Sequence, residues 1–137
     1  MRSLFIAIGN PLRRDDGVAQ AALARLKGVE SRVVHQLTPE MADDIAAYDV
    51  VVFIDADASA SEVRIERLDS LCDGGPSITH VMGPASVVGL SMSIFGFTGQ
   101  AYLCRIPVND LSAGEGLSEQ AVLNAERAAN KLWLVKA

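Results

Sequence analysis

The sequence predicts an α/β fold: a three-layer α/β/α sandwich around a mostly parallel, twisted sheet of about five strands, with one edge strand antiparallel. Strand-like apolar runs alternate along the chain with segments of helical spacing. The run VVVFI at residues 50–54 has no polar residue, which is typical of a parallel strand covered by helices on both faces. No linker, repeat or change in composition divides the 137 residues, so we expect residues 1–137 to form one domain.

The chain begins with a predicted strand and helix. Residues 4–8 are apolar and end at Gly9 and Asn10, which together are a turn signal. Asp15 or Asp16 then opens a helix that extends to about residue 27, because apolar residues recur behind them at helical spacing. We expect Asp15 to be the aspartate that caps this helix.

A second strand, a second helix and a third strand follow. Residues 32–36 have the pattern of a strand. Thr38 followed by Pro39 predicts the N-cap and first residue of a helix that ends near residue 47. The buried strand at residues 50–54 comes directly after it.

The second half of the chain supplies the remaining elements. Residues 63–68 alternate apolar and charged side chains, as a half-exposed strand does. They follow the previous strand too closely for a parallel crossover, so we expect an edge strand antiparallel to its neighbour. An apolar helix at residues 84–97, a buried strand at residues 101–106 and a helix capped by Ser118 and ending near residue 135 complete the prediction.

Composition excludes several classes of function. The net charge is −5 with no basic run, so we expect no binding to nucleic acid. No stretch approaches the roughly 18 apolar residues of a membrane span, and the apolar stretch near the N-terminus is too short for a signal peptide, so we expect no membrane binding and a cytoplasmic protein. Cys72 and Cys104 lie in unlike contexts with no CxxC pair, which argues against a zinc knuckle or a disulfide framework. We expect Cys104, in an apolar run, to be buried and inert.

Polar residues collect where the predicted parallel strands end, the edge at which open α/β sheets bind ligands. Asn10, Asp15 and Asp16 follow the first strand, His35 ends the second, Asp55 and Asp57 end the third, and His80 precedes the helix at residues 84–97. Two carboxylates and an imidazole suit a borderline divalent metal. Taken singly, each residue also fits a helix cap, a turn or a solvated position. The sequence contains no GxGxxG, no GxxxxGK[ST] and no HExxH, and GLSMS misses the GxSxG elbow by its last residue.

One segment resembles the signature of a known family. IGNPLRRDDGVA, residues 8–19, is similar to the G-x-G-N-x-x-x-x-D-[DE]-x-x-G motif of hydrogenase-maturation endopeptidases, with Ala7 and Ala19 where the family often has glycine. IDADAS at residues 54–59, THVMGPASVVGL at residues 79–90 and GEGLS at residues 114–118 follow in the family's order. Together these pieces span nearly the whole chain.

The resemblance implies a function and a site. It implies an endopeptidase that removes the C-terminal extension of a nickel-loaded [NiFe]-hydrogenase large-subunit precursor, with nickel supplied by that precursor. It implies that Asp16, Asp55 and His80 are both the metal ligands and the catalytic residues, with no Ser, Thr or Cys nucleophile. The turn from His35 to Glu40 departs from the glycine-rich turn common in the family, so substrate choice is expected to differ there.

Three alternatives stay open. A different protease on the same scaffold, such as a spore germination endopeptidase, also relies on paired aspartates, but those chains are considerably longer. A non-catalytic module that binds nickel or the hydrogenase precursor would use the apolar helix at residues 84–97 as a docking surface. A small domain that binds an anion at the loop of residues 9–17 is disfavoured, because two adjacent carboxylates there repel anions.

Overall fold

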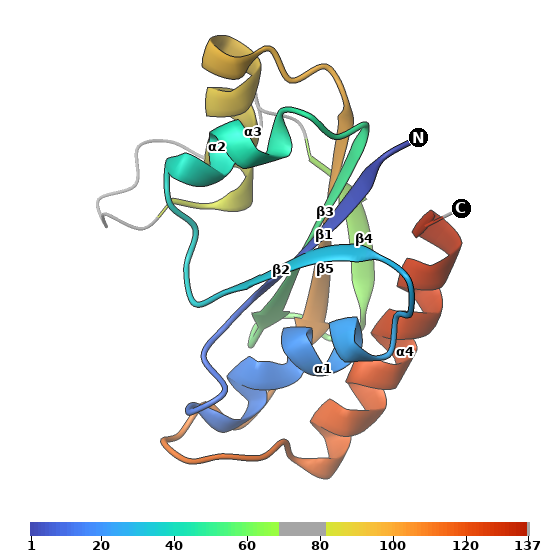
Figure 1. The fold of residues 1–137 in the computed structure, drawn as a ribbon. Coiled ribbons are helices and arrows are strands. Elements are labelled where there is room, and N and C mark those ends of the chain that lie inside the picture. The colour runs from blue at the N-terminus through green and yellow to red at the C-terminus, as the bar shows by residue number, and fades with distance from the viewer. Residues whose placement is uncertain (69–81, 137) are drawn as a thin grey trace.

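The computed structural model of the protein describes residues 1–68 and 82–136. Its centre is a five-stranded sheet in the order β2-β1-β3-β5-β4 (Figure 1). The strands are β1 (Ser3–Ile8), β2 (Glu30–Val34), β3 (Val50–Asp57), β4 (Arg64–Arg67) and β5 (Gln100–Pro107). All neighbours are parallel except β4, which runs antiparallel to β5 at one edge. The predicted sheet and its antiparallel edge strand are therefore confirmed, although β2 begins two residues earlier than expected.

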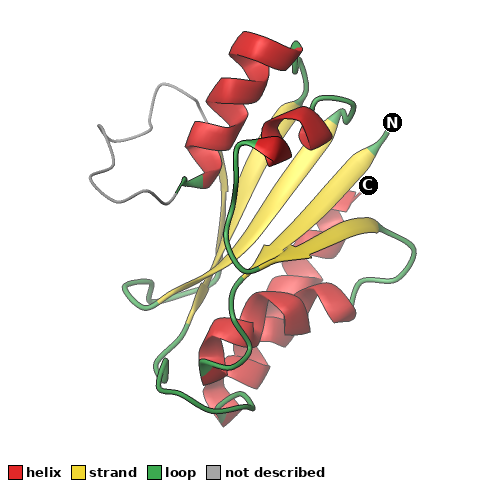
Figure 2. Ribbon diagram, turned by 60° about the vertical axis from the view of Figure 1, so that its left-hand side comes forward, coloured by secondary structure: helices red, strands yellow, loops and turns green. Residues whose placement is uncertain are grey.

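Helices cover both faces of the sheet (Figure 2). A short 3-10 turn, η1 (Arg14–Gly17), leads into α1 (Val18–Ala24), and α1 packs with α4 (Glu119–Lys136) on one face. The other face carries α2 (Glu40–Ile45) and α3 (Pro84–Leu90), and α3 continues as the π-helical turn η3 (Ser91–Phe95). The predicted three-layer α/β/α sandwich is confirmed.

The central strand β3 shows why the sheet is buried on both sides. Val52 and Ile54 belong to the core under α1 and α4, whereas Val51 and Phe53 belong to the core under α2 and α3. This alternation follows from the period of two residues in a strand. Beyond the apolar run, the strand continues to Asp57, so its last residues are polar and only partly buried.

Two predicted helix caps are wrong and one is confirmed. Neither η1 nor α1 has a side-chain cap, so Asp15 does not cap the first helix. The helix α2 is preceded by Pro39 without a side-chain cap, because Thr38 hydrogen-bonds the Glu40 side chain instead, which lowers the pKa of Glu40. Ser118 does cap α4, since its Oγ accepts the Ala121 amide at 3.2 Å.

Other expectations concern burial. Cys104 is fully buried and unpaired, and burial raises the pKa of its thiol to about 12, which confirms an inert cysteine. Cys72 lies outside the described residues. Within residues 1–68 and 82–136, no helix has the length and apolar character needed to cross a membrane.

Candidate functional site

Asp16 is held against the end of β1 by a tight backbone turn. The Asn10 amide donates to Oδ2 of Asp16 at 2.7 Å, and the Leu12 amide donates to Oδ1 of Asn10 at 2.9 Å. Gly9 has a φ of +152°, and a Cβ atom there would overlap the main-chain carbonyl of Asp16. Glycine is therefore required for the close approach of η1 to β1, which brings the Asp16 carboxylate to the carboxyl end of the sheet.

Asp55 lies beside this turn on the neighbouring strand. It is in register with Ile8 at the end of β1, and its side chain is partly buried. Burial, and next the negative charge of Asp16, raise the pKa of Asp55 to about 6, against the opposing hydrogen bond from the Ala56 amide. The structure thus brings together two of the three predicted metal ligands, Asp16 and Asp55.

Two adjacent carboxylates with no cation between them repel each other, and a divalent cation would relieve that repulsion while accepting oxygen ligands from both. The donor set therefore fits a metal ion. Among the residues that the structure describes, no group of three His, Cys, Asp or Glu side chains is arranged to hold one. His80, the third predicted ligand, lies outside the described residues. Met82, the first described residue after it, pairs with Leu37 in an isolated antiparallel β-bridge.

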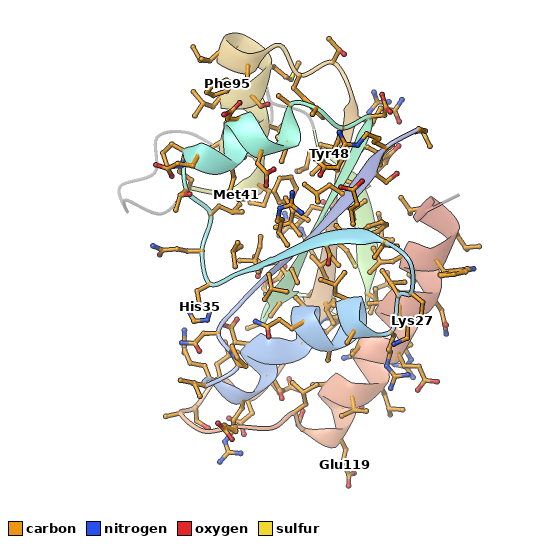
Figure 3. All side chains as sticks on the ribbon, in the orientation of Figure 1. Lys27, His35, Met41, Tyr48, Phe95 and Glu119 are labelled. Atoms are coloured by element: carbon orange, nitrogen blue, oxygen red, sulfur yellow. The ribbon has the colours of Figure 1, made fainter. Side chains whose placement is uncertain are left out.

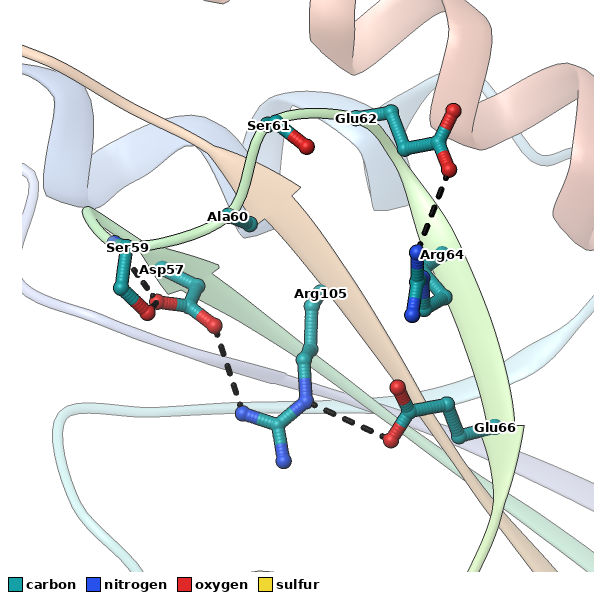
Figure 4. A pocket seen from close by; sticks show the side chains of 8 residues that line it. All are labelled: Asp57, Ser59, Ala60, Ser61, Glu62, Arg64, Glu66 and Arg105. Carbon is teal, nitrogen blue, oxygen red and sulfur yellow. Dashed lines mark hydrogen bonds and ion pairs between the residues drawn. The ribbon is translucent and has the colours of Figure 1, made fainter.

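Asp57 has a different role from Asp55. Its Oδ1 accepts the amide and the hydroxyl of Ser59 at 2.9 and 2.6 Å, and its Oδ2 accepts Nη1 of Arg105 at 3.3 Å (Figure 4). These hydrogen bonds, with those from Ser59 the strongest, lower the pKa of Asp57. Glu66 lies 3.6 Å from Nε of Arg105 on the opposite side. The group lines a cavity of about 220 Å³ together with residues of the segment between β3 and β4.

Asp15, the neighbour of Asp16, is fully buried and anchors the loop before α4. Its carboxylate accepts the Ser118 amide at 2.8 Å, the Ser118 hydroxyl at 2.9 Å, and the amides of Asn109 and Asp110 at 3.2 and 3.1 Å. Burial acts to raise its pKa, but the hydrogen bonds outweigh burial and the pKa is lowered. Asp15 is thus a structural residue that ties η1 to the loop before α4.

Gly114, the first residue of GEGLS, makes the same connection through the backbone. Its amide donates to the Leu12 carbonyl at 2.8 Å, and its carbonyl accepts the Arg14 amide at 3.0 Å. With a φ of +139°, Gly114 has a backbone conformation that favours glycine. In the structure, GEGLS therefore begins with a glycine that pairs with the backbone of the loop before η1.

His35 follows β2 and is exposed at the surface (Figure 3). This exposure agrees with a solvated position at the end of a strand. Whether it contacts a substrate stays a prediction.

The fold is that of known proteases. The chain is similar to the [NiFe] hydrogenase maturation protease HybD from Thermococcus kodakarensis, with a TM-score of 0.74 and 20% identity over 98% of this chain and 99% of that one. It is also similar to the hydrogenase maturating endopeptidase HybD from E. coli, with a TM-score of 0.71 and 18% identity over 98% and 91% of the two chains. The chain is similar as well to HycI from T. kodakarensis, another [NiFe] hydrogenase maturation protease. The TM-score is 0.72 and the identity 22%, over 98% of this chain and 91% of that one.

No protein-family model matches the sequence, and no curated protein gives a significant match. At 18–22% identity these structures are related to the chain through their fold. That relation extends over nearly the full length of each chain, and it agrees with the resemblance seen in the order of the sequence motifs. The chain has the fold of the [NiFe]-hydrogenase maturation proteases.

Proposed function

We propose that this protein is an endopeptidase that removes the C-terminal extension of a nickel-loaded [NiFe]-hydrogenase large-subunit precursor. The observation that carries the proposal is the Asp16–Asp55 pair at the carboxyl end of the sheet, in a fold shared with hydrogenase maturation proteases. In this proposal nickel arrives with the precursor and is part of the substrate.

Asp16 and Asp55 contact the nickel of the precursor, and His80 supplies the third donor that the sequence resemblance implies. Their task is to fix the precursor so that the scissile bond lies over the end of β1 and β3. Bound nickel supplies a Lewis acid that polarises a peptide carbonyl. Cys104 does not compete as a nucleophile, because it is buried in the sheet and its pKa is about 12.

Intact-mass analysis of the precursor tests this function. The precursor is incubated with the protein in nickel-loaded and nickel-free form, and Asp16→Ala is run beside the wild type. We expect a mass loss equal to a C-terminal peptide only with the wild type and the nickel-loaded precursor. Full processing by Asp16→Ala would refute the site, and no processing of a competent precursor would refute the activity.

A second candidate function is a non-catalytic module that binds nickel or the precursor. Its supporting observation is the exposed apolar surface of η3, where Met92, Ile94 and Phe95 are 51%, 66% and 42% exposed. Phe97, the last residue of the helix predicted at residues 84–97, is buried. Tight binding of the nickel-loaded precursor without any mass loss would favour this function over proteolysis.

A further inference from the structure

Arg105 is a basic residue beside Asp55 on the neighbouring strand. It is in register with Asp55 across the parallel β3–β5 ladder, in which strands lie about 4.8 Å apart. Leu103, two residues earlier on β5, packs in the same core as Phe53, two residues before Asp55. Because side chains two residues apart share a face, Arg105 and Asp55 project on the same side of the sheet. The charge of Arg105 acts on Asp55.

The guanidinium of Arg105 is fixed from two sides. Nη1 lies 3.3 Å from Asp57 on β3, and Nε lies 3.6 Å from Glu66 on β4, so the side chain spans three strands. Nη2 is turned away from both carboxylates in the close view (Figure 4). Within the described part of the chain, Nη2 donates no hydrogen bond, and the side chain is 43% exposed. Among the described residues, Nη2 therefore has no hydrogen-bond acceptor, and the Arg105 side chain that carries it lines the cavity shared with Asp57 and Glu66.

Charge narrows the class of ligand that this donor would take. Asp57 and Glu66 together outweigh the single charge of Arg105, and Glu62 offsets Arg64 in the same cavity. The cluster is net negative even without Asp16 and Asp55, so a free anion is disfavoured. A neutral carbonyl oxygen suits it, because it accepts a hydrogen bond and becomes negative only during reaction.

We propose that Arg105 is a catalytic residue whose Nη2 donates a hydrogen bond to the scissile carbonyl oxygen of the peptide. As water adds to the carbonyl carbon, the π electron pair moves onto this oxygen, where the fixed guanidinium stabilises the charge. When the C–N bond breaks, the pair returns and a proton from the water ends on the leaving amine. This assignment rests on the proposed endopeptidase function.

Steady-state kinetics on the nickel-loaded precursor test the assignment. We expect Arg105→Met to lower kcat by about 100-fold or more while KM changes little, since this is the usual loss for one oxyanion donor. Arg105→Lys keeps the positive charge and a long aliphatic side chain but lacks the planar guanidinium group. We expect its kcat to be roughly tenfold below that of wild type. Arg64→Met in the same cavity is the matched control, and we expect its kcat to stay within about twofold of wild type.

Chemical rescue separates a catalytic from a structural role. Added guanidinium ion is expected to restore part of the activity of Arg105→Ala, whereas sodium chloride at equal ionic strength is not. Thermal unfolding of each variant verifies that it is folded. Equal kcat for Arg105→Met and wild type, or a loss confined to KM, would overturn the assignment and leave the protease function standing. A folded wild type that never cleaves the precursor would overturn both.

Discussion

Replacing Asp55 with asparagine is expected to stabilise the metal-free protein above neutral pH while abolishing precursor processing. Burial and the charge of Asp16 raise the pKa of Asp55 from 3.8 to about 6, so the folded protein holds its proton more tightly than the unfolded chain does. A raised carboxylate pKa contributes stability that is fully present below the unfolded value and is lost as pH rises through the folded value. At pH 7 and above, this rise in the pKa of Asp55 corresponds to about 3 kcal/mol by which the ionised carboxylate destabilises the folded protein.

Asparagine resembles the protonated acid in shape and keeps an oxygen that can accept the Ala56 amide. Urea unfolding of wild type and Asp55→Asn in the presence of a chelator, at pH values from 4 to 8, measures the effect. We expect the two proteins to be nearly equal at pH 4 and the variant to gain between about 1 and 3 kcal/mol by pH 8. A variant that is less stable than wild type at pH 8, or a difference that does not change with pH, would refute the reasoning.

Three further substitutions probe the same end of the sheet. Asp15→Asn turns an amide donor toward backbone N–H groups, so we expect a loss of about 2 kcal/mol or more in urea unfolding at pH 7; unchanged stability would contradict the anchoring role. Asp16→Asn removes the neighbouring charge, so the pKa of Asp55 measured by NMR titration is expected to fall; an unchanged value would mean that the two carboxylates do not interact. Gly9→Ala places a methyl group against the Asp16 carbonyl at a left-handed φ, and we expect a loss of about 2 kcal/mol or more in thermal unfolding; a fully stable variant would show that this approach is not tight.

Much of the fold follows from local pattern. The run at residues 50–54 is apolar throughout because helices cover β3 on both faces, and this burial is visible in the sequence. The antiparallel edge strand follows from the length of one connection, since the segment between β3 and β4 is too short for a parallel crossover. The limits of β2 were misplaced because this strand pairs only with β1 and is largely exposed, so no buried periodicity marks where it begins.

The site was predictable in part. Strand order alone places Asp16 and Asp55 at one edge, because the carboxyl ends of β1 and β3 lie side by side. The roles of Asp15 and Arg105 were not predictable in the same way. Their partners are remote in sequence: Asp15 binds residues 94 to 103 positions away, and Arg105 binds Asp57 at a separation of 48. Helix-capping rules depend only on residues within one turn of the helix end. They therefore predicted that Asp15 caps the first helix, a cap that the structure does not contain.

Asp15 and Asp55 are both aspartates at this end of the sheet, but their surroundings shift their pKa values in opposite directions. Asp15 is fully buried, yet three backbone amides and a hydroxyl satisfy it, and its pKa is lowered. Asp55 faces a second carboxylate instead, and its pKa is raised. A fold gains nothing from holding two repelling carboxylates together, so such a pair is a candidate functional site. A bound divalent cation would remove the repulsion, and the free energy that the pair costs the metal-free fold would then favour cation binding.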